Sequence, residues 1–331
     1  MLTVGVDIGG TSVRAGVVDA RGSVLDTSRA PTPAGERALE DALVAAVEEV
    51  ADRHAVNAVG LAVAGFIASD RRTVRFAPHL AWRQADVADR MSDRLGMPVV
   101  LEHDANAAAL AEHRFGAARG AKTAVLVAIG TGIGASLLLN GEVFRGAYGV
   151  APELGHLRVV PNGRPCPCGK NGCWERYCSG TALSATAVEL LAKHPGVSTV
   201  LAREAAGDSR AVTGRRVAGA ARDGDPLAKR ALADLARWRE GLALVADVYD
   251  PEVIVIGEGV GSPLFLTTPA STTPRDRRRP PAGPHPHRAA RRRRRHRGRG
   301  DLGARDGRVD GPQPLPPLLA ARSALVGCPR L

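Results

Sequence analysis

A strand, a glycine-rich turn and a second strand form a unit that occurs twice in this chain of 331 residues. In the first copy, two apolar runs rich in β-branched residues, 2–8 and 13–18, flank Gly9-Gly10-Thr11. In the second copy, Gly130-Thr131-Gly132 leads into the run 135–139, which is followed by Asn140-Gly141, a hairpin turn signal. An internal repeat of one supersecondary unit predicts that the two halves of the chain form similar domains.

The glycine turns indicate phosphate binding. A dinucleotide-binding turn would lead into a helix, and a P-loop would end in Gly-Lys-Ser/Thr; neither pattern follows these turns. A pair of β-hairpins remains, whose bare backbone N–H groups can approach phosphates from two sides. The alternative is that the turns are only tight hairpins that bind no ligand. This alternative would explain a single glycine turn better than a turn that occurs twice. Asp7, just before the first turn, is a candidate to hold Mg²⁺ through water.

Four residues of metal-ligand type stand close together between the second hairpin and residue 180: His156, Cys166, Cys168 and Cys173. Three thiolates and one imidazole make a closed tetrahedral zinc set, which is typical of structural zinc. Disulfides are the alternative, but Cys166 and Cys168 are separated by one residue, and no signal peptide is recognisable at the start of the chain. Cys178 is expected to be a small buried residue.

A carboxylate at a strand-to-helix junction gives a third candidate. Asp104 lies between a strand that ends near residue 101 and a helical run over 107–114. The sequence leaves two roles open for it, a group that acts on a ligand and an N-cap of the helix. Another strand, 58–64, ends at Gly65, and the loop 76–82 after it is expected to form a pocket wall.

The positive charge of the chain is concentrated at its C-terminal end. Residues 266–331 contain 16 of the 45 Lys and Arg, 4 of the 34 acidic residues and 11 of the 23 Pro. This tail has no helical or strand periodicity and is expected to be disordered. It is either an arginine-rich arm for polyanions or the product of a shifted reading frame in GC-rich DNA, and we favour the second. No apolar run approaches the ~20 residues of a membrane span, so a cytoplasmic location is expected.

The motifs D-I-G-G-T, E-x-D-A-N-A-A-A, G-T-G-I-G, E-L-G-H, G-x-x-C-x-C-G-x-x-G-C-x-E-x-x-x-S-G and I-V-I-G together resemble the ROK family of sugar kinases and related repressors. The resemblance implies an α/β fold of two actin-like, ribonuclease-H-like domains with a cleft between them and a zinc-braced loop in the second. Expected boundaries are 1–119 and 120–265, followed by the tail. It also implies ATP-dependent phosphorylation of glucose at the 6-hydroxyl, in a homodimer.

By this resemblance, Asp104 is the base that accepts the proton of the sugar hydroxyl. The implied sugar-binding residues are Gly65, His79, His103, Asp104, Glu153, His156 and Glu175. The implied ATP-binding residues are Asp7, Gly9, Gly10, Thr11, Gly130, Thr131, Gly132, Gly257 and Gly259. His156 would bind sugar with one ring nitrogen and zinc with the other.

The chain departs from the family pattern at several positions. His79 and His103 stand where the family has Asn, which could alter the preferred sugar, and Ser12 replaces a common Lys. The tail replaces an expected strand and two helices, and this predicts a poorly soluble or inactive protein. Alternatives are therefore a kinase for another hexose or N-acetylhexosamine, use of polyphosphate as donor, a catalytically inactive relic, and a sugar-responsive DNA-binding regulator. Against the regulator, the sequence has no recognisable helix-turn-helix segment ahead of Val4.

Overall fold

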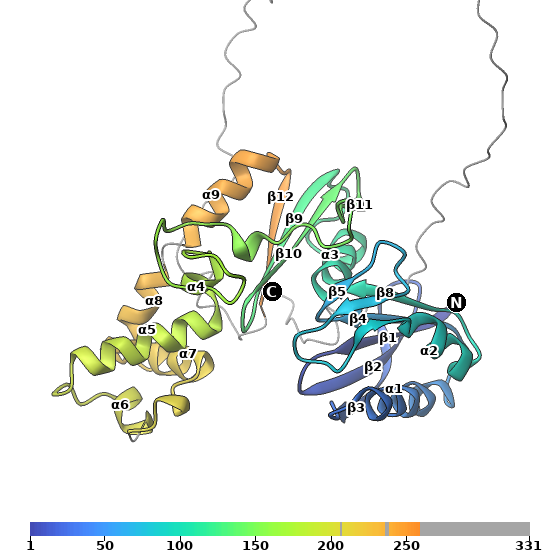
Figure 1. Ribbon diagram of the computed structural model, residues 1–331, viewed down its shortest axis with the longest axis horizontal. Helices are drawn as coiled ribbons and strands as arrows, with labels where there is room; N and C mark the ends of the chain where they lie inside the picture. The colour runs from blue at the N-terminus through green and yellow to red at the C-terminus, as the bar shows by residue number, and fades with distance from the viewer. Residues whose placement is uncertain (206, 236–237, 259–331) are drawn as a thin grey trace, which may run out of the picture. The chain divides into compact units, whose positions relative to one another are not determined.

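The computed structural model describes residues 1–205, 207–235 and 238–258. Its first sheet has five strands in the order β3-β2-β1-β4-β8 (Figure 1). The strands are β1 (Leu2–Ile8), β2 (Ser12–Val18), β3 (Val24–Pro31), β4 (Val56–Val63) and β8 (Val99–His103). Strands β1 to β3 are antiparallel, whereas β4 pairs in parallel with both β1 and β8.

Two helices, α1 (Glu36–Ala51) and α2 (Val87–Leu95), pack in one core on one face of this sheet. Helix α1 buries Leu39, Leu43, Val47 and Val50, a spacing of three to four residues that places them on one helical face. These side chains pack against the apolar residues of β1, β2 and β4 in one continuous core.

The second sheet repeats the strand order of the first. It runs β11-β10-β9-β12, with β9 (Thr123–Ile129), β10 (Ile133–Leu139), β11 (Glu142–Val143) and β12 (Val253–Glu258). The β9–β10 pair is antiparallel and the β12–β9 pair is parallel, as in β2-β1-β4. Between β10 and β11, Asn140 and Gly141 have φ of 55° and 78°, as a two-residue hairpin turn requires. The predicted internal repeat is therefore present in the strand topology.

Helix α3 (Asp104–Phe115) packs against both sheets. Ala107 lies against Ala58 and Ala62 of β4, and Ala109 belongs to a cluster with Leu126 and Leu138 of the second sheet. Alanine side chains allow this helix to approach two sheets closely, which explains the run of alanines after Asp104.

The remaining described elements are mostly helical. They are η1 (Leu154–His156), α4 (Glu175–Cys178), α5 (Gly180–Lys193), α6 (Val200–Ala205), η2 (Ser209–Ala211), α7 (Gly214–Arg222), α8 (Pro226–Asp234) and α9 (Trp238–Tyr249). Helices α5 to α8 share a core of their own, while Leu242 and Val245 of α9 pack with the second sheet. Within the described ranges, no helix is long and apolar enough to cross a membrane.

A small third sheet was not predicted from the sequence. It contains β5 (Phe66–Ile67), β6 (Val74–Phe76) and β7 (Arg83–Ala85). The loop between β6 and β7 includes Trp82, which is fully buried and donates its indole N–H to Glu40 at 3.4 Å. This part of the expected pocket wall is therefore core. The tail 266–331, with its reading-frame interpretation, lies outside the described residues.

Candidate functional site

The central carboxylate of the site lies where β8 gives way to α3. His103 is the N-cap residue of α3, with φ −61° and ψ 140°, and Asp104 is the first residue of the helix. The carboxylate of Asp104 accepts a hydrogen bond of 2.7 Å from the N–H of Ala105. The alternative that Asp104 is the N-cap is therefore wrong, because His103 is the last residue with extended backbone and Asp104 is already helical. A carboxylate in the first helical turn is still favoured by the positive end of the helix dipole.

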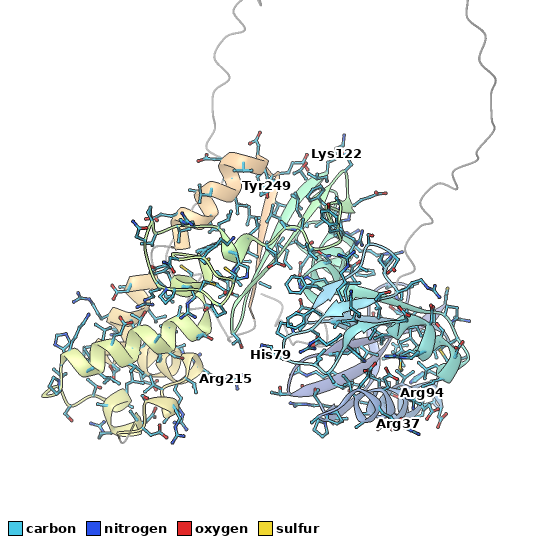
Figure 2. The ribbon with its side chains drawn as sticks, in the orientation of Figure 1. Arg37, His79, Arg94, Lys122, Arg215 and Tyr249 are labelled. Atoms are coloured by element: carbon cyan, nitrogen blue, oxygen red, sulfur yellow. The ribbon has the colours of Figure 1, made fainter. Side chains whose placement is uncertain are left out.

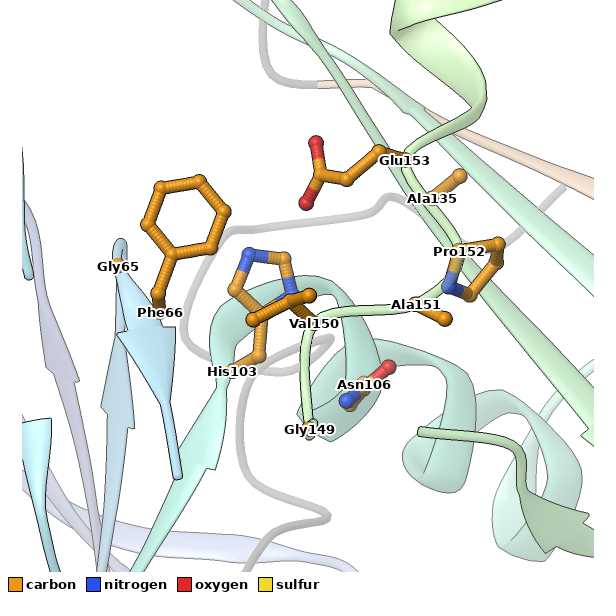
Figure 3. A pocket seen from close by; sticks show the side chains of 10 residues that line it. All are labelled: Gly65, Phe66, His103, Asn106, Ala135, Gly149, Val150, Ala151, Pro152 and Glu153. Atoms are coloured by element: carbon orange, nitrogen blue, oxygen red, sulfur yellow. The ribbon is translucent and has the colours of Figure 1, made fainter. Parts of the chain in front are cut away.

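His103 contacts Asp104 and lines a pocket. Its Nε2 lies 3.2 Å from Oδ1 of Asp104, and about a fifth to a quarter of each side chain is accessible. The pocket is also lined by Gly65, Phe66, Asn106, Ala135 and the segment 149–153. In Figure 3 the imidazole of His103 and the carboxylate of Glu153 both point into it.

Glu153 brings a second carboxylate to this pocket. Its Oε2 lies 3.9 Å from Nε2 of His156. Burial raises the pKa of Glu153, and the negative charges of Glu175 and Asp104 add to this shift, whereas His103 and His156 oppose it. The group therefore retains a proton to higher pH than an ordinary glutamate does, and it suits a role as a hydrogen-bond partner for hydroxyl groups.

The four predicted metal ligands form one cluster. The candidate ligand atoms of His156, Cys166, Cys168 and Cys173 all lie within 4.8 Å of one another. The Sγ atoms of Cys168 and Cys173 are 3.6 Å apart, and Sγ of Cys166 lies 3.6 Å from Nδ1 of His156. A tetrahedral zinc with bonds of about 2.0–2.3 Å would separate its ligands by about 3.6–3.8 Å, so this donor set fits the ion.

The thiols of the cluster differ in their tendency to ionise. Burial raises the pKa of Cys166 to about 12. At Cys168 burial also acts to raise the pKa, but the N–H of Lys170 and the neighbouring thiols lower it overall. A bound cation would favour the thiolate form of all three cysteines.

A compact hairpin holds these ligands in place. The N–H of Cys166 donates to the carbonyl of Lys170 at 2.8 Å, and the N–H of Gly172 donates to Arg164 at 2.8 Å. Gly172 has φ 79°, and a Cβ atom there would lie 1.7 Å from the carbonyl oxygen of Val160. Only glycine fits this position.

Glu175 lies at the start of α4, beside the metal cluster. Its Oε1 is 3.6 Å from Nδ1 of His156 and 3.5 Å from Sγ of Cys166. Its other carboxylate oxygen would lie 2.7 Å from a Cβ at Gly132. The metal cluster and the second glycine turn are thus in direct contact through Glu175.

Both glycine turns have the geometry of short hairpin loops. The N–H of Gly9 donates to the carbonyl of Ser12 at 3.0 Å, and the N–H of Gly130 donates to Gly132 at 2.9 Å. The next two amides of each turn, those of Gly10, Thr11, Thr131 and Gly132, have no acceptor among the residues that the structure describes. Each turn therefore offers two backbone N–H groups to an anion.

Of the predicted sugar-binding residues, His79 does not line the pocket, whereas Gly65 does. His79 (Figure 2) is exposed and lies against the first glycine turn. A Cβ atom added at Gly10 would lie 2.8 Å from the Cβ of His79. Gly65 lines the pocket and cannot carry a side chain, because a Cβ would lie 2.9 Å from backbone atoms of Phe76 and Ala77.

The remaining candidates belong to strands or fall outside the description. Asp7 lies in β1 opposite Arg14 of β2, so both side chains are on one face of the sheet. Gly257 lies in β12 opposite Ala128, and Gly259 is outside the described residues.

Several residues of this region had no role predicted from the sequence, although Glu102 and Asn106 stand in the motif E-x-D-A-N. Asn106 lines the pocket from the first turn of α3, three positions after His103. It also donates to the buried carboxylate of Glu102 at 2.9 Å, and Arg145 forms an ion pair with the same carboxylate. No local pattern links Glu102 with Arg145, which follows it by 43 residues.

Comparison with known proteins identifies the class. Residues 3–278 match the ROK family, to which this chain belongs. The glucokinase of Streptomyces coelicolor is 42% identical over 260 residues, which is 78% of this chain and 82% of that protein. The two-domain, actin-like α/β fold expected from the sequence is confirmed.

A solved structure and a regulator are also similar to this chain. The crystal structure of a ROK family glucokinase from Streptomyces griseus, in complex with glucose and AMPPNP, has a TM-score of 0.69 at 42% identity, and the match covers 78% of this chain and 84% of that one. The xylose repressor of Bacillus subtilis is 33% identical over 55% of this chain, but the match covers only 48% of the repressor.

Proposed function

We propose that this chain catalyses transfer of the γ-phosphoryl group of ATP to the 6-hydroxyl of glucose. The observation that carries the proposal is the pocket that joins the His103–Asp104 junction to Glu153, in a chain similar over most of its length to glucokinases. A hydroxyl-rich ligand needs several fixed polar partners, and His103, Asn106 and Glu153 offer them in one place.

In the proposed reaction, Asp104 accepts the proton of the 6-hydroxyl while that oxygen forms a bond to the γ-phosphorus. The bond between the γ-phosphorus and the β,γ-bridging oxygen breaks, and ADP leaves. Transfer of this kind depends mainly on positioning and charge neutralisation. We assign the amides of the two glycine turns to the phosphates, and Gly65, His79, Glu153, His156 and Glu175 to the sugar side of the site.

Two metals complete the proposal. Mg²⁺ would supply neutralisation of phosphate charge, and Asp7 is the residue that would hold it through water. Zinc at His156, Cys166, Cys168 and Cys173 would be structural and would fix the loop that carries Glu153, His156 and Glu175. The adenosine contacts at Gly257 and Gly259, the domain boundaries near 119 and 265, the homodimer and the cytoplasmic location are further parts of this proposal.

The alternatives are less favoured. The match covers only 48% of the xylose repressor, whereas it covers 82% of the glucokinase of Streptomyces coelicolor. A kinase for another sugar and an inactive relic are distinguished by experiment.

The test is ADP release with glucose as acceptor, using the full chain and its Asp104→Asn variant. Loss of a general base lowers kcat by about 10²–10⁴-fold, with little change in KM for either substrate. Asp41→Asn is the matched control, because Asp41 is an exposed carboxylate on α1 whose partner is Arg94. Glucose-dependent ADP release that is equal in the wild type and Asp104→Asn would refute the assignment of Asp104. The absence of ADP release with any hexose would refute the proposed sugar kinase activity.

A further inference from the structure

Each glycine turn is held by a threonine from outside its hairpin. Thr32, just after β3, donates its hydroxyl to the carbonyl of Gly9 at 2.6 Å and its N–H to the carbonyl of Thr11 at 3.2 Å. Thr181, in the first turn of α5, donates its hydroxyl and its N–H to the carbonyl of Thr131, at 2.8 and 3.3 Å. The two halves of the repeat therefore use the same device, although the threonines come from a strand end in one half and a helix in the other.

These hydrogen bonds determine where the free amides point. In a planar trans peptide the C=O and the N–H of one unit point in opposite directions. The carbonyl of Gly9 shares a peptide unit with the N–H of Gly10, and the carbonyl of Thr131 shares one with the N–H of Gly132. When a threonine holds the carbonyl, the amide of the same unit must point away from that threonine.

We propose that Thr32 and Thr181 are positioning residues for the phosphoryl donor. Each hydroxyl orients one turn so that the amide of Gly10 or Gly132 is available to a phosphate oxygen. The inference rests on the proposed function, because it takes the ligand of the turns to be the phosphate chain of a nucleoside triphosphate. Neither threonine needs to touch the ligand itself.

The local structure does not require either hydroxyl for its own stability. Helix α5 is already capped by Ser179, whose Oγ accepts the N–H of Ala182 at 3.2 Å. The N–H of Gly180 holds the neighbouring carbonyl of Gly130 at 2.8 Å. Thr32 follows the last residue of β3 and is not part of the strand ladder. Loss of the hydroxyl should therefore loosen the turn, which keeps the backbone hydrogen bonds from residues 32 and 181, while the fold remains intact.

The experiment measures the Kd of AMPPNP with Mg²⁺, and separately of glucose, by calorimetric titration of the full chain. The variants are Thr32→Val and Thr181→Val, which keep the side-chain shape, and Thr32→Ser and Thr181→Ser, which keep the hydroxyl. Thr213→Val is the control: Thr213 is exposed, and its hydroxyl caps α7 by accepting the N–H of Arg216 at 3.3 Å.

We expect each valine variant to weaken AMPPNP binding about tenfold, the scale of one charge-assisted hydrogen bond, while the Kd of glucose stays constant. The serine variants should bind AMPPNP as the wild type does, and Thr213→Val should lower the thermal midpoint without changing either Kd. Unchanged AMPPNP affinity in both valine variants would overturn the inference. So would an equal loss of glucose binding, or a failure of serine to restore affinity, because either would indicate a general structural role.

The same titrations separate this inference from the proposed function. A wild-type chain that binds AMPPNP but phosphorylates no sugar would refute the kinase, and the affinities of the valine variants would still decide the role of the threonines. A wild-type chain that binds no AMPPNP would overturn both.

Discussion

At the residue scale, the buried carboxylate of Glu102 links the junction between β8 and α3 to the second half of the chain. It is 1% exposed, forms ion pairs with Arg145 and, at 3.4 Å, with Arg71, and accepts the backbone N–H of His103 at 3.1 Å. The next residue, His103, and Asn106, which donates to Glu102, both line the pocket, so the position of this carboxylate affects theirs.

We predict that Glu102→Gln lowers the free energy of unfolding by about 3 kcal/mol, because it leaves two guanidinium groups in a buried site without their carboxylate. Urea denaturation measures the change. Glu142→Gln on β11 is the control, since Glu142 is exposed and should alter stability by less than about 0.5 kcal/mol. Equal stability of the two variants would contradict the importance of the ion pairs.

At the element scale, the hairpin that carries the cysteines is expected to depend on its metal. We predict that a strong chelator lowers the thermal midpoint and raises KM for glucose, and that added zinc reverses both changes, because the loop positions His156 and Glu175. Cys168→Ser should reduce the zinc content measured by elemental analysis. Cys178→Ser should retain one zinc per chain, since Cys178 is buried and its thiol contacts the carbonyl of Leu235 at 3.8 Å instead.

A second prediction for an element concerns the helical part of the chain. Asp225 caps α8 through the N–H groups of Leu227 and Ala228, and it also accepts the N–H of Leu201 of α6 at 2.9 Å. Burial acts to raise its pKa, but the hydrogen bonds from Leu201 and Ala228 lower it below the ordinary value of 3.8. The folded state therefore favours the ionised carboxylate.

The sign of the pH dependence follows from this shift. A depressed pKa in the folded state contributes stability above pH 3.8, and this contribution disappears as pH falls through the folded pKa. We expect Asp225→Ala to cost about 2 kcal/mol at pH 7 and progressively less below about pH 4. Urea denaturation from pH 7 to 3.5 measures this, with the exposed Asp223→Ala as control. A cost that stays constant down to pH 3.5 would argue against the ionised cap.

Elements with a strong local signal were predictable from the sequence. The run 2–8 coincides with β1, and the predicted strands 13–18 and 135–139 differ from β2 and β10 by one and two residues at the start. The strands β5, β6 and β7 have two or three residues each, too few for a period-2 pattern to be visible. The role of Trp82 as a core residue was also hidden, because its partner Glu40 is far away in sequence.

Site residues follow the same rule. The cysteine cluster was predictable because its members lie within 18 residues and have a distinctive donor chemistry. Asn106 and Glu102 contribute through tertiary contacts, which spacing does not encode. The contact of His79 with Gly10 is likewise a tertiary contact, because only the folded chain places the loop of His79 beside the first turn.

At the scale of the whole molecule, duplication explains why two short turns recur in one chain. The order β3-β2-β1-β4 matches β11-β10-β9-β12, so each half carries its glycine turn at the equivalent hairpin. Helix α3 packs against strands of both sheets and carries Asp104 at its first position. A ligand that uses both turns and this carboxylate would stabilise the fold as a unit.

This leads to a prediction that does not depend on turnover. A ligand that binds only the folded state stabilises it by about 2.7 kcal/mol at a hundredfold excess over its Kd. We expect AMPPNP with Mg²⁺ and glucose each to raise the thermal midpoint measured by calorimetry. At equal concentration, glucose should give a larger shift than mannose, fructose, allose or N-acetylmannosamine.

The pattern of shifts decides between the remaining alternatives. A larger shift with another sugar would show that His79 and His103 have changed the sugar preference of the pocket. A neutral imidazole has one donor and one acceptor and is larger than the amide of the Asn that the family has at these positions. Shifts with both ligands but no ADP release would indicate a chain that still binds its substrates without catalysing the transfer. No shift with any sugar would contradict the assignment of the pocket between His103 and Glu153, since a ligand held there must favour the folded state.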